Sequence, residues 1–171
     1  QLHYVHRSFI YPFQIRVKPG DRTPLLVILM GSFYCGINGY LNGSFVSTYA
    51  DHLNNEWLTD PRFIGGIALF GFGYYMNKRS DQILRSLRTG ATTGYSIPRG
   101  FAFRFVSMPN YLGELITWSG FALASWSLAG VSFVVFTAAN LVPRALANHR
   151  WYRETFSDYP QERKAIFPFL L

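Results

Sequence analysis

The stretch PLLVILMGSFYCGINGYLNGSFV, residues 24–46, decides the class of this protein. It contains no Lys, Arg, Asp or Glu, and it is long enough to cross a bilayer as a helix. A second apolar run, FIGGIALFGFGYYM, covers residues 63–76, and a longer one covers 111–142. We expect the longer run to break near 125–130 and form a hairpin of two spans. Together these runs predict an all-α fold, a polytopic transmembrane helix bundle.

The charged residues are segregated in the way that membrane proteins segregate them. All but one of the 16 Lys and Arg residues fall within 7–22, 78–104 and 144–164. The connector 47–60 carries only acidic charge, on Asp51, Glu56 and Asp60. If each span crosses once, the basic segments share one face, and the positive-inside rule makes that face cytosolic. We therefore expect an integral membrane protein in contact with lipid, in the endoplasmic reticulum of a eukaryote or the inner membrane of a bacterium, and no nucleic-acid partner.

Length and composition bound the organisation further. No composition shift or linker divides the chain, so residues 1–171 are expected to form a single domain. The single cysteine, Cys35, supplies neither a disulfide nor a metal-ligand set, and the histidines are not spaced as metal ligands. Small residues, mainly glycines, recur in both of the first two apolar runs, which is typical of closely packed transmembrane helices.

A polar stripe follows the second span. Ile83, Leu84 and Leu87 recur at helical spacing, so the helix should continue through 77–88 and end before the Gly/Pro-containing loop 89–100. Four polar residues of this segment fall within about 80° of one another on the helix. They are Asn77, Asp81, Arg85 and Arg88. The stripe could hold a polar ligand, or it could be a solvated surface with one ion pair.

A second stripe is expected near the C-terminus. An amphipathic helix should leave the membrane at Pro143 and run to about Phe156. It repeats the i, i+4, i+8 spacing with Arg144, Asn148 and Tyr152. This stripe could equally be the solvated cationic end of a helix.

Glu114 is the only acidic residue in the run 111–142, four residues after Asn110. A carboxylate at membrane depth is costly and usually faces a polar cavity or a partner. Cationic side chains of the two stripes are its expected partners. An arginine-walled cavity of this kind suits a phosphate-bearing ligand.

Six blocks of sequence carry a resemblance to a known family. They are HYVHRSFIYPF at 3–13, EWLTDPRF at 56–63, NKRSDQILRSLR at 77–88, GYSIPRG at 94–100, VSMPNYLGELITWSGFALASWS at 106–127 and HRWYRETFSDYPQERKAIFPFLL at 149–171. In these blocks the chain resembles the C-terminal two-thirds of a steroid 5α-reductase. The resemblance implies a fragment of a seven-helix membrane reductase whose N-terminal helices are missing from the chain. It also implies that NADPH delivers a hydride to the carbon–carbon double bond of a 3-oxo-Δ4 steroid.

The resemblance assigns roles residue by residue. Tyr4 matches the catalytic tyrosine that donates a hydrogen bond to the substrate ketone, and its family partners on an earlier helix are absent from the chain. Asn148 stands where animal enzymes commonly have His, so a hydrogen-bonding group replaces a titratable one. The cofactor-binding positions are Arg7, Asn77, Asp81, Arg88, Tyr95, Asn110, Glu114, Arg144, Asn148 and Tyr152.

Other interpretations remain open. Helical facing places Trp118, Phe133 and Phe136 on the wall of an apolar cavity that could take a steroid or a similar lipid, although ordinary bundle or lipid contact explains them as well. The chain could instead reduce a trans-2-enoyl-CoA or a polyprenal, or it could be a non-catalytic membrane scaffold. We expect it to act as a monomer.

Overall fold

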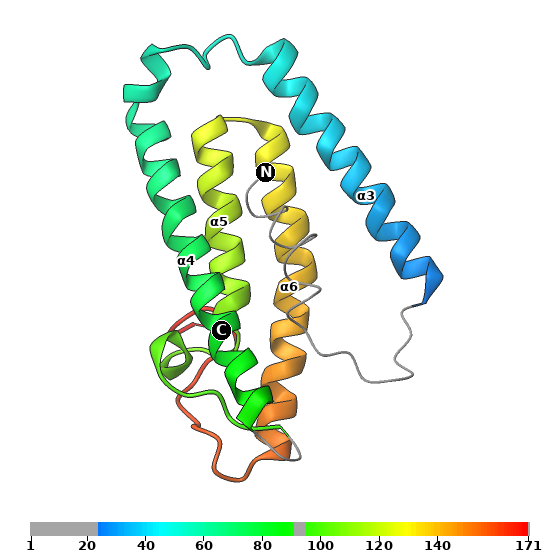
Figure 1. The fold of residues 1–171 in the computed structure, drawn as a ribbon, viewed down its shortest axis with the longest axis vertical. Helices are drawn as coiled ribbons and strands as arrows, with labels where there is room; N and C mark the ends of the chain where they lie inside the picture. Colours follow the sequence, from blue (N-terminus) through cyan, green and yellow to red (C-terminus); the bar gives the residue numbers. More distant parts are fainter. Residues whose placement is uncertain (1–23, 91–94, 171) are drawn as a thin grey trace. The chain divides into compact units, whose positions relative to one another are not determined.

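The computed structural model describes residues 24–90 and 95–170, and within them the protein is helical without β-strands. The long helices are α3 (Leu25–Ser44), α4 (Pro61–Gly90), α5 (Pro109–Ser125) and α6 (Leu128–Thr155). Three short helices join them: the π-helix η2 (Phe45–Tyr49) and the 3-10 helices η3 (Glu56–Thr59) and η4 (Phe101–Arg104). The chain divides into two units between Ser44 and Phe45, and α4, α5 and α6 belong to the second (Figure 1). The predicted all-α helix bundle is confirmed, while its treatment as a single domain stays a prediction.

The predicted first span is a helix. The α3 helix continues through η2, and its side chains are exposed or only partly buried, including Leu26, Phe33 and Tyr40. In the described ranges two helices are long and apolar enough to cross a membrane, Leu25–Tyr49 and Leu128–Thr155. The α5 helix has only 17 residues, and α4 has several glycines and tyrosines in its apolar half. Membrane crossing by α4 and α5 therefore stays a prediction.

Glycines place α4 and α5 in backbone contact. A Cβ atom on Gly66 would lie 2.5 Å from the backbone nitrogen of Ala124, and one on Gly120 would lie 2.4 Å from that of Phe70. Further along this line of contact between the two helices, which we call the glycine seam, Gly73 lies against Gly113 and Thr117. Real Cβ contacts of this length do not occur, so only glycine permits this approach. This confirms a helix-packing role for Gly66 and Gly73 of the second apolar run, whereas a Cβ on Gly71 would meet nothing within 4 Å.

The predicted hairpin between α5 and α6 is confirmed at the expected residues. Trp126 ends α5 in the left-handed conformation, with φ 47° and ψ 47°. Ser127 then caps α6, because its Oγ accepts a hydrogen bond from the Gly130 backbone N–H at 2.9 Å. A second bond, 2.9 Å between the hydroxyls of Ser125 and Ser127, closes the turn.

Beyond the hairpin, the prediction of a separate helix from Pro143 is wrong. The α6 helix runs without interruption from Leu128 to Thr155, with Pro143 inside it. A proline removes one backbone hydrogen bond and usually kinks or ends a helix. Here Leu141 and Ala145, on either side of the proline, are buried, so packing on one face supports the helix through that position. The predicted end near Phe156 is confirmed.

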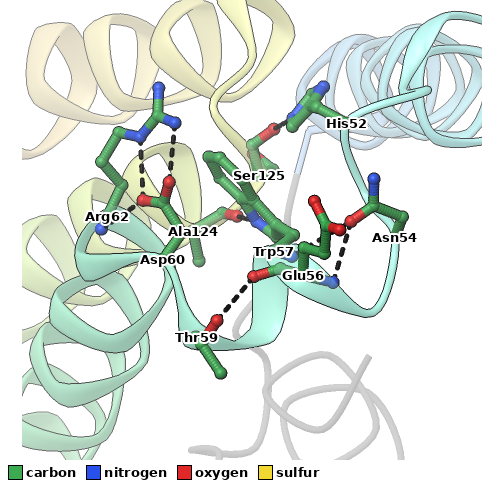
Figure 2. A network of polar contacts seen from close by, with 9 residues as sticks. All are labelled: His52, Asn54, Glu56, Trp57, Thr59, Asp60, Arg62, Ala124 and Ser125. Carbon is green, nitrogen blue, oxygen red and sulfur yellow. Dashed lines mark hydrogen bonds and ion pairs between the residues drawn. The ribbon is translucent and has the colours of Figure 1, made fainter.

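The connector before α4 is hydrogen-bonded to the hairpin between α5 and α6. The Trp57 indole N–H donates to the Ala124 carbonyl oxygen at 2.8 Å, and His52 Nε2 lies 3.1 Å from the Ser125 carbonyl oxygen (Figure 2). Both carbonyl groups lie in the last turn of α5, where no intrahelical donor is available. Asp60 and Arg62, at the start of α4, are linked by two side-chain bonds of 2.8 and 2.9 Å.

The C-terminal segment closes the other end of the bundle (Figure 1). It pairs with the residues before α5: Ser107 N donates to Lys164 O at 2.8 Å, and Met108 N donates to Ala165 O at 3.1 Å. A buried apolar cluster lies beneath this pairing and joins all three helices of the second unit to the segment. Its members are Met76, Val106, Met108, Leu112, Leu115, Ala145, Tyr152, Tyr159 and Ile166.

Candidate cofactor site

The polar residues predicted on α4 and α5 meet at the end of the bundle that the C-terminal segment closes. Asn77 Nδ2 donates to the Asn110 carbonyl oxygen at 3.0 Å, and Asn110 Nδ2 donates to Asp81 Oδ1 at 3.3 Å. Asn77 is 1% exposed and Asp81 is 6% exposed. Asn77 and Asp81, both buried, and the half-buried Asn110 therefore form one polar group that bridges the two helices.

The glycine seam explains why these residues meet. A Cβ atom on Gly113 would lie 2.6 Å from the Asn77 backbone nitrogen, so Asn77 sits where the two helix backbones are in contact. Asp81 follows Asn77 by one helical turn, and Asn110 precedes Gly113 by about one turn. Backbone contact at the seam brings these short side chains within hydrogen-bonding reach of the opposite helix.

The group is rich in hydrogen-bond acceptors. Asn77 Oδ1 and Asn110 Oδ1 are buried and have no hydrogen-bond partner among the described residues. Both amide nitrogens are already used as donors within the group. With the Asp81 carboxylate beside them, these oxygens can accept hydrogen bonds from a ligand that carries N–H or O–H groups.

The predicted α6 residues lie against the start of α5 and the C-terminal segment. Asn148 is half-buried, and its Nδ2 is 3.7 Å from the Met108 sulfur, just before α5. Tyr152 is buried, and its ring stacks on that of Tyr159 with 5.4 Å between centroids. Glu114 is half-buried, one turn after Asn110 on α5. The cationic partner expected for Glu114 stays a prediction.

Other predicted cofactor residues lie outside this group. Arg144 is exposed on α6, and Tyr95 is exposed, with its ring edge against Trp151 at 5.1 Å between centroids. The backbone of Arg88 belongs to the last turns of α4, and its side chain lies outside the described part. Tyr4 and Arg7 also lie outside the described residues.

The predicted substrate residues separate into a buried pair and an exposed residue. Trp118 of α5 and Phe133 of α6 are each 6% exposed, and their ring centroids are 4.5 Å apart. Phe136 is 42% exposed. Nearer the hairpin, an open groove of about 540 Å³ runs between α5 and α6 and is lined mainly by apolar side chains, including Leu123 and Val131.

Sequence reasoning missed a second polar cluster beside the first. Ser107 Oγ lies 2.6 Å from both His149 Nδ1 and the Tyr159 hydroxyl, and Arg163 Nη1 donates to that hydroxyl at 3.3 Å. These residues come from the loop before α5, from α6 and from the C-terminal segment. No local spacing could have indicated their meeting, because the partners are 42 and 52 residues away from Ser107.

Comparison with known proteins decides the family. The family model for 3-oxo-5-alpha-steroid 4-dehydrogenase matches residues 21–171. The chain belongs to this family. It is 46% identical to 3-oxo-5-alpha-steroid 4-dehydrogenase 1 of Bos taurus over 99% of its own length and 65% of that protein.

Relatives from plants and humans agree. Within this steroid 5α-reductase family, the chain is 44% identical to steroid 5-alpha-reductase DET2 of Solanum lycopersicum over 98% of the chain and 65% of that protein. It is 43% identical to human 3-oxo-5-alpha-steroid 4-dehydrogenase 2 over 99% of the chain and 65% of that protein. The chain thus spans about two-thirds of the length of these relatives, and the family predicted from the sequence blocks is confirmed.

Proposed function

We propose that the chain forms the cofactor-binding part of an integral-membrane, NADPH-dependent 3-oxo-5-alpha-steroid 4-dehydrogenase. The observation that carries this proposal is the Asn77–Asn110–Asp81 group, whose two buried amide oxygens have no donor within residues 24–90 and 95–170. A buried polar atom without a partner costs about 1–3 kcal/mol, which a ligand donor would recover. The carboxamide and ribose hydroxyls of a nicotinamide dinucleotide are donors of this kind, so the residues fit the cofactor.

Each part of the group has a role in this proposal. Asn77 and Asn110 accept hydrogen bonds from the cofactor, and Asp81 accepts from a hydroxyl. Arg88, Arg144 and Arg7 face the phosphates, because guanidinium groups bind phosphate oxygens in a bidentate way. Glu114, Tyr95, Asn148 and Tyr152 complete the cofactor site. When bound, NADPH supplies the hydride that saturates the steroid double bond.

The substrate is proposed to lie on the apolar side of the same site. Trp118 and Phe133 form a buried aromatic pair there, and Phe136 extends that wall along α6. Tyr4 donates a hydrogen bond to the ketone oxygen of the steroid, where negative charge develops as the double bond is reduced. The cofactor face is proposed to be cytosolic, in the endoplasmic reticulum or a bacterial inner membrane, with the protein acting as a monomer.

The experiment is NADPH oxidation by the detergent-solubilised protein with a substrate panel. We expect turnover with progesterone or testosterone and the 5α-reduced steroid as product, with little turnover of trans-2-enoyl-CoA or polyprenal. Failure with both steroids, together with turnover of one of the other substrates, would reassign the reaction within conjugated carbonyl reduction. Failure to bind NADPH at all would favour a non-catalytic scaffold.

Asp81→Asn tests the group that carries the proposal. The change keeps the size of the side chain but weakens its acceptor strength, so NADPH affinity should fall by about tenfold. Glu154→Gln is the matched control, because Glu154 is exposed near the end of α6 and also loses one negative charge. Equal affinities for the two variants would remove Asp81 from the cofactor site.

A further inference from the structure

The Ser107 hydroxyl joins three separate segments of the second unit. Its oxygen lies 2.6 Å from His149 Nδ1 on α6, 2.6 Å from the Tyr159 hydroxyl and 3.1 Å from the Lys164 carbonyl oxygen on the C-terminal segment. Ser107 is 1% exposed and Tyr159 is 2% exposed. Four polar atoms therefore converge in a space that solvent hardly reaches.

Only one hydrogen-bond direction in this cluster is fixed by chemistry. Arg163 can only donate, so its Nη1 donates to the Tyr159 oxygen. The Ser107 hydroxyl has one hydrogen, which it donates to the Lys164 carbonyl oxygen, to the Tyr159 oxygen or to His149 Nδ1 when that nitrogen carries no proton. Its oxygen can accept from the other groups that carry a hydrogen. Contacts of 2.6 Å are at the short end of the range for hydroxyl hydrogen bonds.

A serine beside a histidine also resembles the nucleophile and base of a hydrolase. The surroundings of Ser107 exclude that role. A nucleophile must reach a substrate, whereas this hydroxyl is buried and is already surrounded by His149, Tyr159 and the Lys164 carbonyl. The arrangement is instead a hydrogen-bonded tie between segments, made by Ser107, His149 and Tyr159.

This tie lies next to the residues of the candidate cofactor site. Ser107 precedes Asn110 by three residues, and its own backbone is tied to Lys164. His149 follows Asn148 directly and precedes Tyr152 by three residues. The α5 and α6 helices are joined covalently only at the hairpin, and they pack less extensively on each other than α4 and α5 do. A tie at the opposite end therefore adds to the buried apolar cluster there in fixing their separation.

We propose that Ser107 is a positioning residue, which through His149 and Tyr159 holds α5 and α6 at the separation that lets Asn110 and Tyr152 bind the same cofactor. This inference rests on the proposed function for the identity of the ligand. Ser107 itself does not contact the cofactor. Its effect on binding arises because an untied α6 must be ordered by the ligand, which lowers the affinity of that ligand.

The first test compares Ser107→Ala, Tyr159→Phe and the double variant in the detergent-solubilised protein. Each single change should raise the Kd for NADPH by about five- to tenfold, the effect of losing a buried hydrogen bond. The Kd of the double variant should be no higher than that of the more affected single variant, because both changes break the same tie. At saturating NADPH, kcat and the KM for the steroid should stay within about twofold. Ser107→Thr, which keeps the hydroxyl, should restore most of the affinity.

Ser132→Ala is the control, because Ser132 is an exposed serine of α6 whose hydroxyl donates to the Ala129 carbonyl oxygen of the same helix at 2.8 Å. An unchanged Kd in Ser107→Ala and Tyr159→Phe would overturn the proposal. A loss of kcat or of thermal stability without a change in Kd would overturn it too, since that result indicates a general structural role.

A second measurement does not depend on NADPH. Cys35 is first replaced by Ser, so that spin labels attach only at two introduced cysteines, Gln82→Cys on α4 and Arg150→Cys on α6, both at exposed positions. The distance between the two labels reports how far α6 lies from the α4–α5 pair. Ser107→Ala should broaden the distance distribution or shift it to longer distances in the cofactor-free protein. Identical distributions would refute the tie. If the parent protein binds no NADPH, the proposed function fails and the role in cofactor binding fails with it, while this distance still shows whether the tie exists.

Discussion

Gly73 and Gly113 face each other across the α4–α5 seam so closely that a Cβ atom on Gly73 would lie 2.6 Å from the Gly113 carbonyl oxygen. The contact lies one turn from Asn77, the first residue of the buried polar group. Helix register and site geometry are therefore fixed at the same place. If an added methyl group pushed α4 and α5 apart at this contact, the hydrogen bonds donated by Asn77 and Asn110 should change.

Gly113→Ala should destabilise the protein and weaken cofactor binding together. The added methyl group would meet the Asn77 backbone nitrogen at 2.6 Å, and overpacking of this kind costs about 1–3 kcal/mol. Thermal unfolding and NADPH titration in detergent measure the two effects. Gly71→Ala is the matched control, because a Cβ on Gly71 in the same region of α4 would meet nothing within 4 Å. If both variants unfold at the same temperature, the seam is not as tight as the contact distances indicate.

Trp57→Phe should lower stability by about 1–3 kcal/mol, because it leaves the Ala124 carbonyl oxygen without its indole donor (Figure 2). The guanidinium of Arg62 also stacks on the Trp57 ring, 4.5 Å from its centroid, and phenylalanine would largely keep that contact. Trp126→Phe serves as the comparison, since the Arg62 guanidinium also lies over the Trp126 ring, 4.7 Å from its centroid, and Trp126 is 54% exposed. A stability loss as large in Trp126→Phe would assign the effect to the stacking and not to the hydrogen bond.

The Asp60–Arg62 pair should make stability depend on pH in the acidic range. The hydrogen bonds from Arg62 lower the pKa of Asp60 from 3.8 to about 2. Because the folded-state pKa is the lower one, the contribution of the pair is fully present above the ordinary pKa and is lost as the pH falls through the folded-state value. Thermal midpoints should therefore decrease between pH 4 and pH 2 (about the interval between these pKa values), and Asp60→Asn should flatten that part of the profile. Asp158→Asn is the control, because Asp158 meets Arg99 at 3.3 Å with both side chains about two-thirds exposed. An acid profile in Asp60→Asn that matches the parent protein would contradict the assignment.

Arg88→Ala should weaken NADPH binding by tenfold or more (about 1.4 kcal/mol per tenfold) with a smaller effect on kcat. The reason is that a phosphate loses a charge-assisted partner. Arg79→Ala is the control on the same helix, because Arg79 is exposed and donates only to Gln82 in the described contacts. An NADPH affinity equal to that of the parent protein would remove Arg88 from the cofactor site.

Tyr4→Phe should leave NADPH affinity nearly intact and lower steroid turnover sharply. The phenolic hydroxyl is proposed to act on the substrate ketone, and loss of one such donor typically lowers kcat by about a hundredfold or more. Kd for NADPH and kcat for the steroid, measured on the same preparation, separate the two effects. Comparable losses of affinity and rate would count against a role at the substrate oxygen.

Much of the fold was predictable because helices are determined locally. The apolar runs predicted the helical segments, and the recurrence of small residues in the first two of them indicated close packing. The site was predictable in part for the same reason: spacing placed Asn77 and Asp81 on one stripe, and Asn110 four residues before Glu114. The one wrong boundary, at Pro143, arose because a proline disfavours a helix locally, whereas packing of Leu141 and Ala145 keeps α6 continuous.

The sequence by itself determined which segments are helical, where the hairpin turns and which family the chain belongs to, because periodicity, turn residues and aligned blocks are local properties of the chain. Only the tertiary structure decided that Gly73 meets Gly113, that Asn110 bridges Asn77 and Asp81, and that Ser107 joins His149 to Tyr159. These contacts link residues that are 29–52 positions apart. Their formation depends on the register between helices, which is set by steric contact between backbones and not by the pattern within any one helix.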